Sequence, residues 1–437
     1  MSPPPAGPRA GSTVSTPAAL LRIDGARLLR RLGELAAIGS TERDGVTRLA
    51  FSPEDVAARE LVASWLHDAG LDSHVDAAAN LVAGPAPDAE RPALVMGSHL
   101  DTVVDGGRLD GAYGVVAAVE VAATLAEAGH ELHHDLRIVA FSDEEGANGT
   151  PGMLGSQALV GVLDPFDLER VDDEGVRTGG RVFAAGGDPD EIASAAWPAG
   201  SIAGYLELHI EQGPVLAEED LPIGIVEAIT GRGTAEVVIT GTANHAGTTP
   251  MDLRHDAMTA AAEVVLAVER LALDGRVRVA TAGHLRLTPN VRNVVAGEAV
   301  LGLDLRDVDD ARIADAVAEL RRQVAEIAAR RRVEIEVLDG QGVIAMPCDP
   351  GLVGDVDGAA RGLGLPTMRL PSGAGHDAQV DARVAPMAMI FVPSEGGISH
   401  NPAEHTEPDA LVAGADVLLQ ALLAADERLW AQERSTP

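Results

Sequence analysis

The chain has 437 residues, more than one hydrophobic core usually supports, so two domains are expected. Its 33 basic and 67 acidic residues give a net charge of -34, which repels nucleic-acid phosphates and anionic lipid and predicts neither as a partner. The absence of lysine excludes P-loop chemistry, a pyridoxal Schiff base and a lysine nucleophile, and the single cysteine, Cys348, excludes an intrachain disulfide.

Residues 1–17 are rich in Pro, Ala, Gly and Ser and contain no hydrophobic segment. This composition predicts a disordered tail and not a secretory signal. No run in the chain reaches the roughly 18 uninterrupted apolar residues that a membrane-spanning helix needs. The expected location of the protein is therefore the cytoplasm, without a membrane partner.

From residue 18 onward the sequence alternates between helix and strand patterns. Ser52 can cap a helix that ends near residue 67. Short apolar runs at 93–98 and 136–141 predict buried strands, each followed by polar residues. The segment 111–129 has apolar residues at helical spacing and a glycine where the helix would end. This order predicts an α/β sheet whose site lies at the carboxyl ends of the strands.

The pattern changes in the middle of the chain. Residues 160–203 are richer in Gly, Asp and Pro and predict a looser segment with short helices, before a strand at 205–210. From about residue 227 the elements follow a β-α-β-β-α-β order, which is typical of a compact two-layer module. These elements are expected at 235–240, 255–273, 278–287, 299–306, 311–330 and 333–338.

The predicted fold class is α/β with two domains. A larger domain with a mixed sheet is expected to be divided between residues 18–226 and 341–437. The two-layer α+β module at 227–340 would be inserted between these two parts.

A histidine and two aspartates follow the first buried strand. In His99-Leu100-Asp101-Thr102, a spacing of two residues lets the Asp101 carboxylate orient the imidazole while the other ring nitrogen takes a metal. The same pair also occurs in ordinary hydrogen-bonded loops. Asp110 comes after two glycines at a helix start, where it could be an N-cap or, beside His99, a carboxylate that bridges two metals.

Three acidic residues follow the second buried strand. Asp143, Glu144 and Glu145 repel one another unless a cation or a shared proton relieves them. Successive side chains point apart, so one glutamate could bind a metal while the other acts as a base. A solvated acidic loop is the alternative in so acidic a chain.

Two further histidines stand near the ends of predicted strands. His209 lies in the alternating segment 207–211, whose polar face either turns into a cleft or is exposed to solvent. His400 follows the apolar run 388–392. The neighbours His133 and His134 lie between a helix and a strand, and we interpret them as surface residues without a function.

The inserted module also carries polar residues suited to binding. His245 lies beside Asn244, and Asn293 precedes a strand that carries Asp304 and Arg306. Arginine is suited to two-pronged binding of a carboxylate. Arg306 could equally pair with Asp304 or with the next aspartate, Asp307.

Taken together, these segments resemble the dinuclear-metal amidohydrolases of the aminoacylase and carboxypeptidase G clan. The resemblance is to the branch of N-carbamoyl-L-amino acid hydrolases, allantoate amidohydrolases and β-ureidopropionases, and it extends from about residue 25 to the C-terminus. The segments that carry it are 97–102 (GSHLDT), 207–214 (ELHIEQGP), 244–251 (NHAGTTPM), 372–377 (SGAGHD) and 397–402 (GISHNP).

The resemblance implies a metallopeptidase-like catalytic domain that holds two divalent cations. His99, Asp110 and His209 would bind one cation, and Asp110, Glu145 and His400 the other. Such ligands accept Zn, Mn, Co or Ni.

The resemblance also implies roles in catalysis and in substrate binding. Glu144 would be the general base, and Asp101 belongs to the catalytic set. His245 would polarise the substrate carbonyl from a lid, the inserted module, which pairs with its copy in a homodimer. The substrate-binding residues would be Gln212, His245, Asn293, Arg306, Gly375 and His376.

The expected activity is hydrolysis of the carbamoyl group of an N-carbamoyl-L-amino acid or related small ureido acid. Allantoate is an alternative substrate, and an aminoacylase or dipeptidase is an alternative enzyme. A catalytically silent ureido-binding protein would lack Glu144 or a ligand, and none is missing. After Gly146 many relatives have Arg-Phe where this chain has Ala147 and Asn148, which bears on the choice of substrate.

Overall fold

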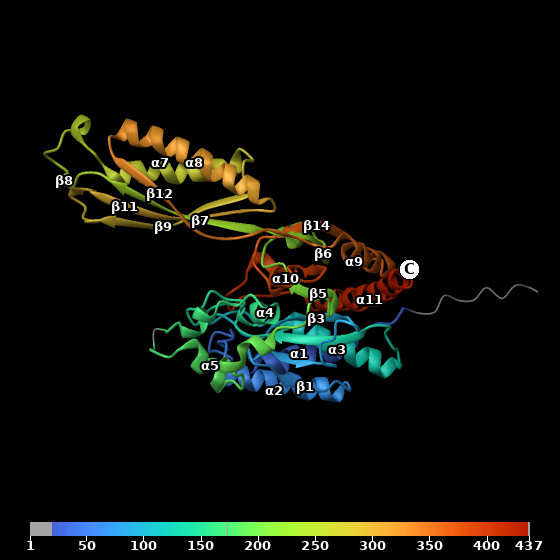
Figure 1. Cartoon of the computed structure of the whole chain (residues 1–437). Coiled ribbons are helices and arrows are strands. Elements are labelled where there is room, and N and C mark those ends of the chain that lie inside the picture. Colours follow the sequence, from blue (N-terminus) through green and yellow to red (C-terminus); the bar gives the residue numbers. More distant parts are fainter. Residues whose placement is uncertain (1–19, 173, 436–437) are drawn as a thin grey trace, which may run out of the picture.

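The computed structural model describes residues 20–172 and 174–435, so the predicted tail at 1–17 lies outside the described residues. The chain forms two lobes (Figure 1). The larger lobe contains both the N-terminal and the C-terminal parts of the chain, and the smaller lobe contains its middle.

The larger lobe contains a mixed sheet. Its strands are β1 (Ser73–Val75), β2 (Leu81–Ala83), β3 (Ala93–His99), β4 (Asp135–Phe141), β5 (Ile202–Ile210), β6 (Ile223–Ile229), β13 (Met346–Pro347), β14 (Thr367–Ser372) and β15 (Met387–Val392). Among the described residues they follow the order β1-β2-β4-β3-β5-β15-β6-β13, with β14 paired to β6. The central strands β4, β3, β5 and β15 run parallel, so their carboxyl ends meet at one edge.

The larger lobe also contains helices, several of which pack on the sheet, and the ends of some of them follow local sequence signals. The helices are α1 (Gly25–Ala36), α2 (Pro53–Asp68), α3 (Ala112–Ala128), α4 (Leu154–Leu159), α5 (Thr178–Ala184), α6 (Val215–Glu218), α9 (Pro350–Gly362), α10 (Asp377–Asp381) and α11 (Pro408–Glu433). The Ser52 side chain caps α2, and Gly129 ends α3 in the left-handed conformation. Both signals were predicted from the sequence.

The segment between α4 and β5 contains short helices, as expected. They are α5 and the 3-10 helices η1 (Pro165–Glu169) and η2 (Pro189–Ala195). A separate small apolar cluster beneath them includes Leu154, Leu168 and Val182.

Helix α11 is long and apolar enough to cross a membrane by length and composition. It packs instead against α3, α9, β5 and β15 in this lobe. Its buried residues include Leu411, Val417, Leu418 and Leu422, which belong to the main hydrophobic core. This helix therefore has the position of a core helix in the larger lobe.

The smaller lobe is a two-layer α+β module. Its strands are β7 (Gly231–Thr240), β9 (Val279–Thr288), β11 (Glu298–Asp307) and β12 (Glu334–Val343), its helices are α7 (Ala257–Leu273) and α8 (Asp310–Arg331), and the short elements β8 (Asn244–His245), β10 (Val294–Val295) and η3 (Met251–Leu253) extend from it. Among the described residues, the antiparallel order is β12-β7-β11-β9, and the two helices lie against one face (Figure 1). The predicted β-α-β-β-α-β order is confirmed.

The two lobes are joined by two adjacent chain segments. β6 leads directly into β7, and β12 leads back into β13, which pairs with β6. The larger lobe is thus built from two separated parts of the chain, and the α/β fold class is confirmed. The domain boundaries at 226/227 and 340/341 stay predictions.

The interpretation of His133 and His134 as surface residues without a function is wrong for His134. His134 is buried, and its Nδ1 lies 2.7 Å from Asp426 Oδ1 in α11. The imidazole of His133 stacks on Trp430, with ring centroids 5.1 Å apart. The contacts of His133 and His134 therefore connect the start of β4 to α11.

Candidate active site

The predicted site residues meet at one edge of the larger sheet. His99 ends β3, His209 lies near the end of β5, and Glu144 and Glu145 follow β4. Because these strands are parallel, their polar ends converge. The alternative of a solvent-exposed β5 face is excluded, since Glu207 and His209 are both buried.

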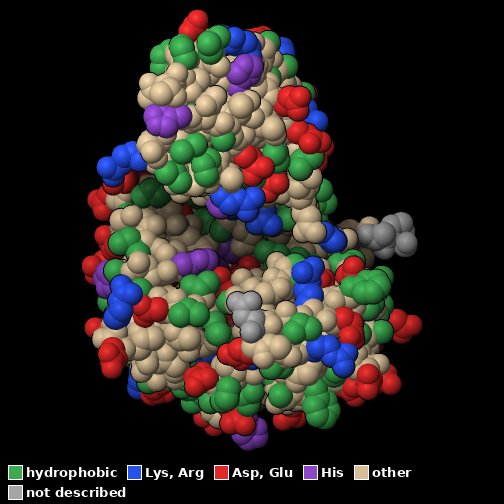
Figure 2. All heavy atoms as spheres, turned by 90° about the vertical axis from the view of Figure 1, so that its left-hand side faces the viewer, with side chains coloured by type: hydrophobic (Ala, Val, Ile, Leu, Met, Phe, Trp, Pro, Cys, Tyr) green, Lys and Arg blue, Asp and Glu red, His purple; other side chains and the backbone are tan. Residues whose placement is uncertain are grey.

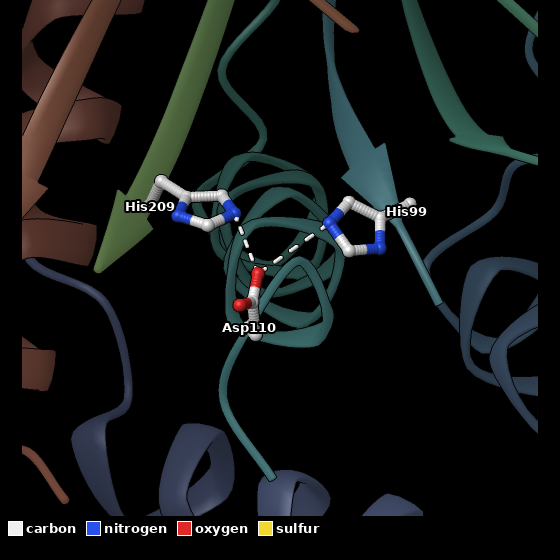
Figure 3. Close-up of side chains that lie close together, drawn as sticks. All are labelled: His99, Asp110 and His209. Carbon is white, nitrogen blue, oxygen red and sulfur yellow. Dashed lines mark ion pairs between the residues drawn. The ribbon is translucent and has the colours of Figure 1, made fainter. Parts of the chain in front are cut away.

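Asp110 lies between the two histidines, in front of α3. Its Oδ1 is 3.6 Å from His99 Nε2 and 3.3 Å from His209 Nε2 (Figure 3). The adjacent Gly111 has φ +62, and a Cβ there would lie 2.4 Å from the His99 ring. Glycine is therefore required for this close approach.

The second oxygen of Asp110 faces the other predicted group. Its Oδ2 is 3.3 Å from His400 Nε2, which is also 3.3 Å from Glu145 Oε2. In each of the groups His99–Asp110–His209 and Asp110–Glu145–His400, the potential ligand atoms lie within 4.8 Å of one another. The structure thus brings together all five predicted metal ligands, with Asp110 common to both groups.

The donor set fits a pair of divalent cations. Imidazole nitrogens and carboxylate oxygens bind such ions, and one carboxylate with an oxygen in each group can bridge two of them. The Nδ1 atoms of His99 and His209 lie 3.0 and 2.9 Å from the main-chain carbonyls of Asp101 and Ile210. These bonds turn each Nε2 toward Asp110, as second-layer partners of metal-binding histidines commonly do.

The prediction for Asp101 needs a correction. Its main-chain carbonyl, and not its carboxylate, orients His99, because the nearest carboxylate oxygen is 3.8 Å from Nδ1. The Asp101 carboxylate instead accepts the main-chain N–H groups of Glu144 and Glu145, at 3.3 and 3.2 Å. It therefore fixes the loop that carries the two glutamates.

The charges in this cluster depend on one another. Burial works against a charged Asp110, but hydrogen bonds with His209, His400 and His99 outweigh it and hold the pKa of this carboxyl well below its usual value. The hydrogen bond with Asp110 raises the pKa of His400 to about 9, and burial raises the pKa of Glu145 to about 7. The cluster thus holds protons that a cation would displace.

Glu144 faces the same cluster. Its Oε2 is 3.7 Å from His99 Nε2. Burial, opposed by His99, raises the pKa of the Glu144 carboxyl well above its usual value. A carboxylate with a raised pKa is a stronger base, which suits it to accept a proton during a reaction.

A cavity of about 440 Å³ opens above this cluster, between the two lobes. Figure 2 shows the hollow, with basic side chains along its upper edge. Its lining includes Glu144, Glu145 and His400 of the larger lobe and Arg232 and Arg306 of the smaller lobe. A small molecule bound there would contact both lobes.

Three of the predicted substrate-binding residues line this cavity, namely Gln212, Arg306 and Gly375. Gln212 Nε2 donates to Asp110 Oδ2 at 2.9 Å. Arg306 forms a two-pronged ion pair with Asp304, at 2.8 and 3.1 Å, and also donates to the Gly373 carbonyl of the larger lobe at 2.6 Å. The ion pair between Arg306 and Asp304, one of the alternatives that the sequence left open, is thus present.

The other predicted substrate-binding residues do not line the cavity. His245 and Asn293 belong to the β8 and β10 region, which lies at the far end of the smaller lobe (Figure 1). His376 does not line the cavity either, because its side chain is buried between His209 and Phe391, and its contact with a substrate stays a prediction. The His376 ring packs against the His209 ring, with centroids 4.7 Å apart.

Sequence reasoning missed three polar residues of the site. Glu404 is buried behind Asp110, and Arg232 and Arg383 line the cavity. The sequence signal that could have indicated Glu404 is its position two residues beyond the motif at 397–402. Arg232 could have been found as the cross-strand partner of Arg306 once the register was known.

A model of peptidase family M20/M25/M40 matches residues 95–424, which is most of the chain. The chain belongs to this family. The predicted resemblance is therefore confirmed at the level of the M20 family and of its metallopeptidase-like fold.

Individual M20 relatives match nearly the whole chain. An N-carbamoyl-L-amino acid amidohydrolase of Geobacillus stearothermophilus is 42% identical over 400 residues, which cover 91% of this chain and 97% of the relative. An allantoate deiminase of Arabidopsis thaliana is 32% identical over 437 residues, covering 92% and 82%. The crystal structure of a hydantoinase/carbamoylase family amidase from Burkholderia ambifaria matches with a TM-score of 0.85 and 41% identity, covering 93% and 98%.

Proposed function

We propose that this protein hydrolyses the carbamoyl group of N-carbamoyl-L-amino acids. The observation that carries the proposal is Asp110, which lies between two groups of metal-binding side chains at the floor of a cavity that Glu144 lines. Relatives that are 35–42% identical over more than nine tenths of this chain are named as enzymes acting on these compounds. The reaction consumes one water and releases the amino acid, carbon dioxide and ammonia.

His99, Asp110 and His209 would hold one divalent cation, and Asp110, Glu145 and His400 would hold the other. Bound there, such cations lower the pKa of water and stabilise negative charge that develops on the carbonyl oxygen. Zn, Mn, Co and Ni are all compatible with the donor set.

Glu144 is the proposed general base. Its carboxylate lies on the cavity wall, takes a proton from the attacking water and passes it to the departing nitrogen. Its raised pKa supports the first step, because it makes the Glu144 carboxylate a stronger base toward the water, and the protonated carboxyl group then donates this proton to the departing nitrogen. Gln212, Arg306 and Gly375 would bind and orient the substrate from the same cavity.

His245 and Asn293 are proposed to act in a homodimer. His245 is exposed, and its Nδ1 accepts the main-chain N–H groups of Gly247 and Thr248, both at 3.1 Å. A neutral ring with this pattern carries its proton on Nε2, which can donate to a substrate carbonyl. Since neither residue lines the cavity of its own chain, the smaller lobe would present them to the site of a second copy.

The proposal is tested with Glu144→Gln in the metal-loaded protein. The variant is expected to retain both cations by elemental analysis and to lose at least roughly 100-fold in kcat on N-carbamoyl-L-methionine, since general-base catalysis contributes about 10²–10⁴-fold. Wild-type turnover by the variant would reject the role of Glu144. Hydrolysis of N-acetyl amino acids or dipeptides, without any hydrolysis of ureido compounds, would reject the proposed function.

Allantoate is the second candidate substrate. Plant relatives named allantoate deiminase are 32–33% identical over about nine tenths of this chain. Parallel assays with allantoate and N-carbamoyl-L-methionine distinguish the two candidates. A kcat/KM that is at least about tenfold higher for allantoate than for every N-carbamoyl-L-amino acid tested, acidic ones included, would make allantoate the better assignment.

A further inference from the structure

Two arginines of the cavity wall have no partner. Arg232 and Arg383 both line the cavity, and among the described residues neither side chain has a hydrogen bond, an ion pair or a ring contact. Most arginines of the larger lobe are paired, as in Arg43–Asp105 and Arg91–Asp135. The side chains of Arg232 and Arg383 are both exposed, and so are Arg286 and Arg292 of the smaller lobe, for which no side-chain partner is found within the described chain either. It is therefore the shared position of Arg232 and Arg383 on the cavity wall, and not the lack of a partner alone, that points to a ligand.

The two arginines come from opposite lobes. Arg232 lies on β7 directly across from Arg306 on β11, so both point from the helix-free face of the smaller sheet into the cavity. Arg383 follows α10 in the larger lobe. Two unneutralised cations thus face one cavity from its two sides.

The carboxylates of the cavity do not neutralise these arginines. Glu144 lies against His99, and Glu145 lies against His400. Arg306 differs from its neighbour Arg232, because three of its five N–H groups donate to Asp304 and to the Gly373 carbonyl, which leaves two for a substrate. The free positive charge of the cavity is therefore on Arg232 and Arg383.

We propose that Arg232 and Arg383 bind a second carboxylate, on the side chain of the substrate. The preferred substrate is then the N-carbamoyl derivative of an acidic amino acid. This inference rests on the proposed function for the reaction itself. The planar guanidinium fork matches a carboxylate, and a ligand that bridges both lobes also relieves the repulsion between two like charges.

An apolar side chain is the competing occupant. Met153, Val343 and Val380 also line the cavity and would favour it. Both guanidinium groups are exposed to solvent in the open cavity, so an apolar group placed against them would remove their water without supplying an acceptor, which is costly. This difference makes the two occupants separable by experiment.

The test compares N-carbamoyl-L-glutamate with N-carbamoyl-L-glutamine, which has nearly the same shape without the charge. The wild-type enzyme is expected to have a kcat/KM about tenfold or more higher for the glutamate compound, because charge-assisted hydrogen bonds are stronger than neutral ones. Arg232→Gln and Arg383→Gln should each reduce this preference by about tenfold. Arg30→Gln, which removes one charge from the surface of α1 outside the cavity, should retain it.

A second measurement separates this inference from the proposed function. Calorimetry on the metal-loaded Glu144→Gln protein measures the Kd of both compounds without turnover, and Arg383→Gln in that background should weaken only the preference for glutamate. Equal affinity and equal kcat/KM for the two compounds would overturn the inference while leaving ureido hydrolysis intact. Failure to hydrolyse any ureido compound, with the binding preference present, would reject the proposed function alone.

Discussion

Glu404 lies behind Asp110 and accepts its main-chain N–H at 3.2 Å through Oε1. The same oxygen accepts the N–H of Leu109 at 2.8 Å. Ser399 Oγ lies within hydrogen-bond distance of both Glu404 Oε2 and Asp110 Oδ2, at 3.1 and 2.8 Å. Glu404 therefore positions the main chain of Asp110 directly and its side chain through Ser399.

Removal of this support should weaken metal binding. We expect Glu404→Ala to lower the metal affinity by about 10–100-fold, because partners behind the ligands commonly contribute this much. Competition with a chelator measures the effect. Glu404→Gln retains an acceptor for the two N–H groups and should lose less, and equal affinities for the wild type and both variants would contradict this role.

The metal affinity should also rise with pH. Hydrogen bonding with Asp110 raises the pKa of His400 from 6.5 to about 9, so the metal-free protein keeps a proton there at neutral pH. A metal needs the neutral imidazole, so the proton competes with it below pH 9. We expect the affinity to rise from pH 7 to pH 9, by up to about tenfold per unit for one titrating ligand.

The pH dependence is measured by zinc titration against a chelator of known pH response, together with the protons released. His405→Gln is the matched control, since His405 pairs with Glu407 at 3.4 Å and belongs to neither ligand group. It should leave the slope unchanged. An affinity that is constant between pH 7 and pH 9 would be inconsistent with His400 as a ligand.

The fold was largely predictable because its main elements carry local signals. Ser52, Gly129 and the apolar runs mark helix and strand ends that the structure retains. The sheet order was not predictable, because β5 and β15 are neighbours although they are more than 170 residues apart in the chain. Pairings over such distances leave no periodic pattern in the sequence.

Site residues that directly follow strand ends could be predicted from the sequence. The burial of the other site residues could not. His99, His209 and Glu145 converge as expected, since their strands end at one edge. His376 belongs to a recognised segment, but sequence does not reveal that Phe391 and His209 enclose it. Glu404 was missed because an isolated glutamate in a loop resembles any solvated acid.

Assembly of the site across two subunits can be tested by mixing inactive variants. His245→Ala and Glu144→Gln are each expected to be nearly inactive. In a mixed dimer, the subunit with Glu144 intact would receive His245 from its partner, so one site per mixed dimer is complete. A 1:1 mixture after subunit exchange should therefore regain about a quarter of the wild-type activity, since half of the dimers are mixed.

Co-expression with two different tags also allows the mixed dimer to be purified, and the purified mixed dimer should show about half of the wild-type activity, because one of its two sites is complete. An inactive mixed dimer, or a fully active monomer, would contradict the proposed contribution of His245 to the partner's site. Unmixed samples of each variant at the same concentration provide the background rate.

Asp426 should contribute strongly to the stability of the larger lobe. This buried residue of α11 accepts the main-chain N–H groups of His133 and His134, both at 2.9 Å, and pairs with the His134 ring. Asp426→Ala leaves these donors without an acceptor and is expected to destabilise the lobe by about 3 kcal/mol, which lowers its Tm by roughly 5–10 °C. Calorimetry provides the measurement. Asp409→Ala, at an exposed position of the same helix, should shift the Tm by no more than about 2 °C, and an equally small shift for Asp426→Ala would show that the contact adds little.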